Sequence, residues 1–143
     1  MAFAWRDDLT TELDEIDGDH RQILAELYAL LPPFDGSEAN RRRQVVTLQV
    51  LERYLIEHIA KEEDYLRSSG YPRLELHVAD HARLTAAVAG LRIRLQTEGA
   101  PPETLQRQIK ELADWVIVHI NTFDRDFAHY LHRRSTELPR ATA

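Results

Sequence analysis

The chain has 143 residues, a formal net charge of −6 and no cysteine. Its length corresponds to one domain that can bury a core without disulfides. The lack of cysteine excludes zinc fingers, iron–sulfur clusters and cysteine nucleophiles, and the negative charge argues against non-specific nucleic-acid binding. The first residues do not form a secretory signal, and no stretch is apolar for long enough to cross a bilayer. We therefore expect a cytoplasmic protein without membrane insertion.

In chain order, the sequence predicts an N-terminal arm followed by four helices. The arm covers residues 1–17, and apolar residues such as Trp5 should pin it to the helices. Loops rich in proline, glycine and serine separate segments of helix-forming composition. The expected helices cover residues 18–31, 38–67, 72–97 and 102 to about 133. Ser37 is a suitable N-cap for the second helix. Four amphipathic helices with short connections predict a single all-α domain over residues 1–143, whose bundle of about 18–133 is antiparallel and up-down-up-down.

Side chains that bind metals recur on every expected helix. They are His20 on the first, His58 and Glu62 on the second, His77 and His81 on the third, and His119 and Asp124 on the fourth. Side chains four residues apart share a helix face, so His77 and His81 can chelate one ion from one helix. Taken singly, each group is more often a surface or packing feature than a metal site, but an inward Glu62 would need a cation or a metal beside it. In an antiparallel bundle, these early and late positions alternate in the way that places all of them at the same end.

The pair His119 and Asp124 requires an irregular helix. Five residues advance a regular α-helix by about 500°, which leaves the two side chains about 140° apart. If both bind metal, the helix must end, bulge or turn tightly between them, and π-bulges are common at such sites. The remaining histidines, His129 and His132, lie beyond the inward-facing stretch and close to Arg133, so we expect them on the surface.

The composition of this ligand set indicates two metal ions. Seven ligands are too many for one ion, and nitrogen and oxygen donors without thiolate point to iron or manganese, with zinc as a competitor. On two six-coordinate irons, the five imidazoles, two bridging carboxylates and a bridging oxo or hydroxo group leave one position open. Ferritin-like di-iron bundles are richer in carboxylates and use Glu-x-x-His motifs, which this sequence lacks. One vacancy among apolar side chains suits reversible binding of one small neutral molecule.

At these positions the sequence resembles the hemerythrin family, in particular its single-domain bacteriohemerythrins, over about residues 5–131. Besides the seven ligand positions in their order and spacing, the resemblance rests on Trp5, Ile16-Asp17, Glu62-Glu63, Gly70-Tyr71-Pro72 and His119-Ile120. It implies that His77, His81 and His119 bind one iron, that His20 and His58 bind the other, and that Glu62 and Asp124 bridge the pair. It also implies a bridging oxo or hydroxo group and reversible O2 binding at the second iron, for oxygen storage, transport or supply.

Two positions depart from the family pattern. Asp19 stands where the family usually has Gln before its first histidine ligand, and Leu66 stands where it usually has Met. Asp19 alters the charge and solvent access near His20, whereas Leu66 is a packing substitution. The expected O2 pocket lies one helical turn from the ligands and is lined by Ile23, Leu24, Trp115 and Val116. An apolar wall of this kind would keep water and protons away from the bound gas.

Three other functions are compatible with the same centre. An enzyme could oxidise a substrate or turn over peroxide or nitric oxide there, and Asp19 and Glu63 are its only candidate proton-delivery groups. A sensor of O2 or redox state would have to act through a partner in trans, because 143 residues leave no room for an output domain. A structural metal site would need a closed coordination sphere. We favour O2 binding over catalysis, and the sequence indicates no particular protein partner.

Overall fold

The computed structural model describes residues 5–30, 37–97 and 102–137 of the chain. The first four residues, most of the first and third expected loops and the last six residues therefore lie outside the described part. In chain order the elements are the 3-10 turn η1 (Asp7–Leu9), α1 (Asp14–Ala29), α2 (Glu38–Ser68), α3 (Leu74–Thr97), α4 (Pro102–His119), the π-helical segment η2 (Ile120–Asp124) and α5 (Arg125–Glu137). No strand occurs among these residues, which confirms the all-α class.

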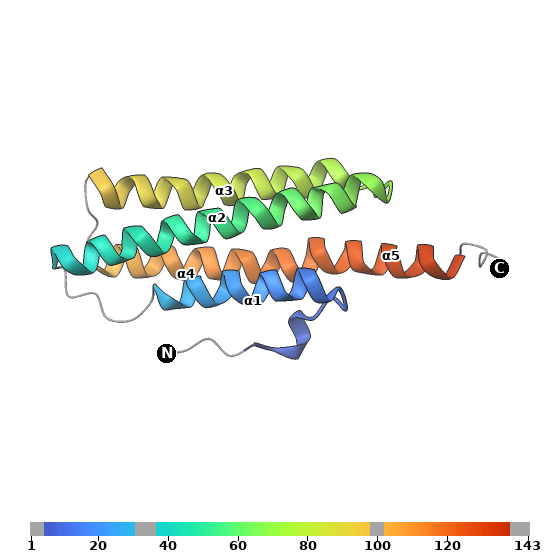
Figure 1. Cartoon of the computed structure of the whole chain (residues 1–143), viewed down its shortest axis with the longest axis horizontal. Helices are drawn as coiled ribbons and strands as arrows, with labels where there is room; N and C mark the ends of the chain where they lie inside the picture. Colours follow the sequence, from blue (N-terminus) through green and yellow to red (C-terminus); the bar gives the residue numbers. More distant parts are fainter. Residues whose placement is uncertain (1–4, 31–36, 98–101, 138–143) are drawn as a thin grey trace.

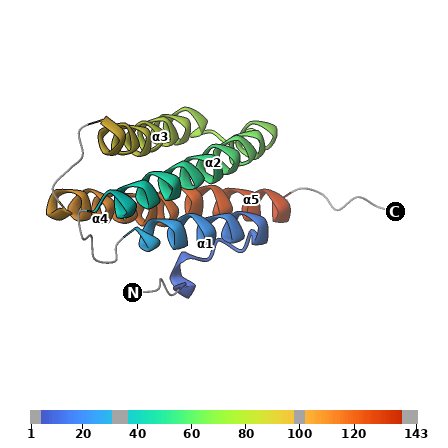
Figure 2. The same ribbon diagram turned by 60° about the vertical axis from the view of Figure 1, so that its left-hand side comes forward.

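The helices form an antiparallel four-helix bundle. In Figure 1, α2 and α3 lie together above the continuous rod of α4, η2 and α5, and α1 lies below that rod. Helix α1 packs against α2 and α4, and α3 packs against the same two helices, which closes the ring. Figure 2 shows the same arrangement from another side, with the N-terminal arm lying along α1. The predicted up-down-up-down bundle is thus confirmed.

The apolar core is divided into two unequal parts. The larger cluster fills the end of the bundle away from the α2–α3 turn, with residues such as Leu27, Leu51, Leu91 and Ile109. The smaller cluster comprises Leu66, Tyr71 and Phe127. On α2 and α3 the predicted metal-binding residues fall between these clusters in sequence, and on the α4–α5 rod His119 and Asp124 lie on either side of Ile120, the last member of the larger cluster. A polar layer therefore lies between two apolar ones. Burial of the apolar clusters supplies the main driving force for folding, and the layer between them is the only part of the described core that is rich in charge.

Local sequence explains both ends of α2. The Ser37 hydroxyl accepts a hydrogen bond from the Asn40 N–H at 3.1 Å and caps α2, as predicted. Helix α2 ends at a turn in which Gly70 has φ +69°, the left-handed conformation that glycine adopts without strain. The next helix, α3, begins at Leu74, two residues later than the expected start at Pro72. The last helix extends to Glu137, beyond the expected end near residue 133.

The first helix starts earlier than the sequence predicted. It begins at Asp14 instead of Gly18, and its first turn is rich in acidic residues, which interact favourably with the positive end of a helix dipole. The buried Asp17 carboxylate accepts hydrogen bonds from the backbone N–H of Thr11 at 2.9 Å and from its hydroxyl at 2.7 Å. These bonds tie the arm to α1, and Trp5 and Leu9 pack on the larger core cluster. The arm is thus fixed at the edge of the polar layer, close to His20.

Candidate metal centre

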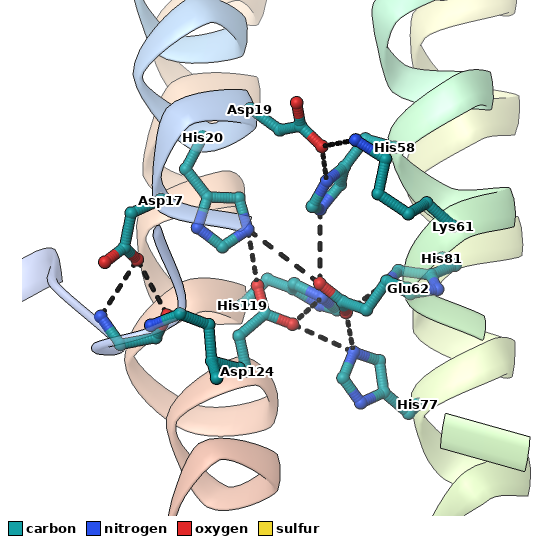
Figure 3. A network of polar contacts seen from close by, with 12 residues as sticks. Asp17, Asp19, His20, His58, Lys61, Glu62, His77, His81, His119 and Asp124 are labelled. Carbon is teal, nitrogen blue, oxygen red and sulfur yellow. Dashed lines mark hydrogen bonds and ion pairs between the residues drawn. The ribbon is translucent and has the colours of Figure 1, made fainter. Parts of the chain in front are cut away.

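The structure brings all seven predicted metal-binding side chains together in the interior. Each is buried, and they form two overlapping groups whose candidate ligand atoms lie within 4.8 Å of one another. One group comprises Glu62, His77, His81, His119 and Asp124, and the other comprises His20, His58, Glu62 and Asp124. Figure 3 shows that they converge from α1, α2, α3 and the rod in which α4 ends at His119 and η2 ends at Asp124. His129 and His132 are exposed, as expected.

Glu62 is shared between the two groups through its two oxygens. Its Oε1 lies 2.7 Å from Nε2 of His77 and 3.2 Å from Nε2 of His81. Its Oε2 lies 3.2 Å from Nε2 of His58 and 4.0 Å from Nε2 of His20. A carboxylate at the bundle axis therefore presents one oxygen to each set of imidazoles, which is the arrangement of a bridging ligand.

Asp124 repeats this division from the opposite side of the bundle. Its Oδ1 lies 2.9 Å from Nε2 of His77 and 3.1 Å from Nε2 of His119, whereas its Oδ2 lies 2.9 Å from Nε2 of His20. The side chain reaches this position because residues Ile120–Asp124 are π-helical. A π-helix bonds residue i to residue i+5, so its wider turn returns a fifth residue to the same side of the helix. The irregularity that the sequence required is thus present between His119 and Asp124.

The buried atoms at the centre lack hydrogen-bond partners within the protein. Both oxygens of Glu62 and of Asp124, and the Nε2 atoms of His20, His77, His81 and His119, make no well-formed hydrogen bond in the described part of the chain. Each buried polar group left in this state costs about 1–3 kcal/mol. Carboxylate oxygens and imidazole nitrogens are suitable ligands for a divalent first-row metal. Bound cations would give these atoms the partners that the protein does not, so the residues fit a metal centre.

Three of the five imidazoles are held from behind by a carboxylate. Nδ1 of His58 donates to Asp19 at 3.0 Å, Nδ1 of His81 donates to Glu63 at 3.2 Å, and Nδ1 of His119 donates to Asp80 at 2.6 Å. Such bonds fix the ring orientation and tautomer so that Nε2 faces the metal, and they increase its strength as a donor. Each of the three carboxylates also pairs with a cation, namely Lys61, Arg67 and Arg83 respectively.

Sequence reasoning identified only part of this outer shell. Asp19 and Glu63, the candidates for proton delivery in the alternative of an enzyme, each lie behind a histidine. Asp80 is not predicted from the sequence at all, although it directly precedes His81 and is buried in the structure. Its partner His119 is 39 positions away, so only the packing of α3 against α4 makes their contact. Asp80 follows His77 by three positions and so lies on the inward face of α3, and an aspartate on that face is the signal that would have indicated a role for it.

The charges in the metal-free protein shift several pKa values. The hydrogen bond from His58 lowers the pKa of Asp19 to about 2, against the opposing effect of burial. Burial alone would lower the pKa of His58, but the hydrogen bond to Asp19 and the nearby Glu62 carboxylate outweigh it and raise that pKa to about 9. Burial is likewise outweighed at His119, where the charge of Asp124 raises the pKa to about 10. Without metal, these imidazoles therefore hold protons that partly neutralise the carboxylates.

The four residues expected to line an O2 pocket occupy different surroundings. Ile23, Leu24 and Val116 are buried in the larger core cluster, and His20 and His119 lie three or four residues from them on the same helices. Trp115 is only partly buried, and its indole N–H donates to Asp80 at 3.3 Å. Trp115 also lines a shallow groove of about 200 Å³ between α3 and α4. Its indole therefore braces the Asp80–His119 pair.

Comparison with known proteins identifies the family of this bundle and its buried His/carboxylate cluster. The pattern described as "Hemerythrin HHE cation binding domain" matches residues 8–131. The chain belongs to the hemerythrin family. It is 27% identical over 129 residues to Bacteriohemerythrin of Clostridium acetobutylicum, with 87% of this chain and 98% of that protein covered. It is 28% identical over 127 residues to Bacteriohemerythrin of Stenotrophomonas maltophilia, covering 87% and 78%. It is 27% identical over 122 residues to Hemerythrin subunit alpha of Lingula anatina, covering 85% and 89%.

The family assignment confirms the resemblance that the sequence indicated, and the buried cluster fits non-haem iron. Over the described ranges, none of the helices combines the length and the apolar character that crossing a membrane requires.

Proposed function

We propose that this protein binds O2 reversibly at a non-haem di-iron centre. In this proposal His77, His81 and His119 bind one iron, His20 and His58 bind the other, and Glu62 and Asp124 bridge the two, with an oxo or hydroxo group as a third bridge. The observation that carries the proposal is the division of both carboxylates, each of which presents one oxygen to each set of imidazoles. Membership of the hemerythrin family supports the same function.

The two halves of the proposed centre differ in the number of protein donors. Three imidazoles face one half, and two face the other. The half with His20 and His58 therefore has room for one more small ligand, and we assign O2 to it. When bound, iron would supply the electrons for O2 binding, and the chain would supply the ligands and the apolar surroundings. Neutral imidazole ligands suit an iron whose oxidation state must change while the helices that carry the ligands stay in place.

The apolar side chains around the centre limit the entry of water. Ile23, Leu24 and Val116 are each at most 5% exposed and form a wall of the larger core cluster beside the polar layer. A small neutral gas enters such apolar surroundings at little cost in free energy, whereas water and protons lose their hydrogen-bond partners there. We assign these three residues to the O2 pocket and Trp115 to the support of His119.

The test is an optical titration of the iron-loaded protein. The protein is reduced without oxygen, exposed to air and then returned to vacuum, while its visible charge-transfer absorption and its iron content are measured. We expect two irons per chain and a visible band that appears in air and disappears under vacuum. Rapid and irreversible conversion to an oxidised spectrum would contradict oxygen carriage and favour a redox enzyme or a sensor. One iron per chain would contradict the two-metal assignment.

A further inference from the structure

Asp19 gives a single carboxylate oxygen to two different cationic or hydrogen-bonding partners. Its Oδ2 accepts a hydrogen bond from Nδ1 of His58 at 3.0 Å and lies 3.0 Å from Nζ of Lys61. Figure 3 shows the aspartate on α1 reaching across to both side chains on α2. Because the Lys61 ammonium and the His58 Nδ1–H share one acceptor oxygen, the positive charge of Lys61 makes that oxygen a weaker acceptor for His58.

The other two outer carboxylates do not share an oxygen between an imidazole and a cation, although Oδ2 of Asp80 also accepts from the neutral indole N–H of Trp115 at 3.3 Å. Glu63 accepts from His81 through Oε1 and pairs with Arg67 through Oε2. Asp80 accepts from His119 through Oδ2 and pairs with Arg83 through Oδ1. In those two cases the cation and the imidazole use separate oxygens. Of the three histidine–carboxylate pairs in the described chain, only the one behind His58 has its accepting oxygen in contact with a cation as well.

Lys61 is held in place by further contacts. Its Nζ also lies 3.0 Å from Oε1 of Glu15, whose Oε2 accepts a hydrogen bond from the Tyr65 hydroxyl at 2.9 Å. The Lys61 and Asp19 side chains are 34% and 29% exposed. Solvent therefore screens this pair less than it screens a fully exposed ion pair, and the ammonium cannot easily move away from Oδ2.

A hydrogen bond from Nδ1 to a carboxylate makes the opposite ring nitrogen a stronger metal donor, and a stronger donor favours the more highly charged oxidation state of iron. We propose that Lys61 is a positioning residue that weakens the Asp19–His58 hydrogen bond and thereby slows oxidation of the iron held by His20 and His58. The inference rests on the proposed di-iron function and assigns to Lys61 the control of one half of that centre. It also explains how this chain can use an aspartate at position 19: a carboxylate there is acceptable because a fixed cation shares its charge.

The first measurement does not depend on iron or O2. The His58 Nδ1–H resonance is recorded by NMR in zinc-loaded protein for the wild type, Lys61→Met, Lys61→Arg and Lys110→Met. Methionine keeps much of the apolar stem and removes the charge, arginine keeps the charge, and Lys110 is the only other lysine and is exposed. We expect a downfield shift of this resonance in Lys61→Met alone, because the hydrogen bond to Asp19 strengthens. Lys61→Arg should remain close to the wild type.

The second measurement uses the iron-loaded proteins. The midpoint potential should fall in Lys61→Met, and oxidation in air should become roughly tenfold faster, the lower end of the effects that partners of metal-binding histidines have. Asp19→Asn should raise the potential, because it removes the carboxylate altogether. These opposite signs separate a charge effect from a general loosening of the site, which would move both variants in the same direction.

A wild-type or upfield His58 resonance in Lys61→Met, or a midpoint potential equal to or above that of the wild type, overturns the inference. The same shifts in Lys110→Met also overturn it, because they would show a general effect of net charge. Failure of the proposed function is a separate result: it appears as a wild-type protein without a reversible visible band, and the zinc measurement still reports on Lys61.

Discussion

Asp124 Oδ1 lies 3.1 Å from His119 Nε2, although five positions separate the two residues. The contact depends on the π-helical segment between them, in which Ile120 and Asp124 are buried. A regular helix would carry Asp124 away from the imidazoles of α3 and α1. The seven buried side chains thus converge because one turn of the last helical rod departs from α-helical geometry, and the bundle on either side of that turn continues without a break.

Replacement of Glu62 by Gln should reduce iron loading from two ions per chain to one or none. The amide keeps the size of the side chain but loses the charge, and its nitrogen is a poor metal ligand. Iron per folded chain, measured by elemental analysis after gel filtration, checks this. Glu57→Gln is the matched control, because Glu57 is exposed on the same helix. Two ions per chain in Glu62→Gln would rule out the bridging role.

Replacement of Asp80 by Asn should weaken metal binding without loss of the fold. Asp80 holds His119 through a 2.6 Å contact, and loss of such an outer-shell partner typically costs about 10-fold to 100-fold in metal affinity. Competition with a chelator, followed for zinc or ferrous iron, measures this affinity. Asp114→Asn changes an exposed aspartate on α4 and should match the wild type. Equal affinities in the two variants would exclude a role for the Asp80–His119 contact.

The metal-free protein should lose stability as the pH rises from about 6.5 to 10. The pKa of His58 is raised from 6.5 to about 9 and that of His119 to about 10. A raised pKa means that the folded state holds the proton more tightly than the unfolded state, so the stabilisation is complete below pH 6.5 and disappears as the pH passes the folded values. Thermal melting at pH 6 and pH 9 with a chelator present should give the lower melting temperature at pH 9.

The metal-loaded protein provides the contrast for this pH effect. Metal bound at Nε2 replaces the proton on each imidazole, so loading should release protons and remove most of the alkaline destabilisation. A metal-free protein that melts at the same or a higher temperature at pH 9 than at pH 6 would contradict the raised histidine pKa values.

Replacement of Phe127 by Ala should destabilise the protein by about 3–5 kcal/mol. Phe127 is 1% exposed and belongs to the small apolar cluster with Leu66 and Tyr71, which closes one side of the polar layer. Urea unfolding monitored by circular dichroism gives the free energy of unfolding. Val118→Ala, at a position that is 57% exposed, is the control and should change stability little. A loss below 1 kcal/mol for Phe127→Ala would mean that this cluster does not help to hold the bundle together.

The same cluster accounts for the departure at position 66. Leu66 is fully buried against Tyr71 and Phe127. Leucine and methionine have similar volumes, so either can fill this site. Leu66→Met should therefore cost less than about 1.5 kcal/mol, as measured by the same unfolding experiment.

The sequence predicts the bundle because each helix has its own apolar periodicity and because local signals, such as the N-cap Ser37 and the turn residue Gly70, mark where a helix begins or ends. It also predicts the irregular turn before Asp124, because spacing and shared ligation conflict on a regular helix. It does not predict the start of α1 at Asp14, which depends on hydrogen bonds from Thr11 to Asp17. Nor does it predict Asp80, whose importance arises from a partner on another helix. Such contacts between elements leave no periodic signal along the chain.

The division of the Glu62 and Asp124 oxygens has a consequence for the assembly of the proposed centre. Once one ion binds one oxygen of each carboxylate, the other oxygen of each is already oriented toward the empty position. The second ion then binds without the cost of ordering those side chains, so loading should be cooperative. In a titration with limiting iron, chains with two ions and chains with none should coexist, and chains with a single ion should be scarce.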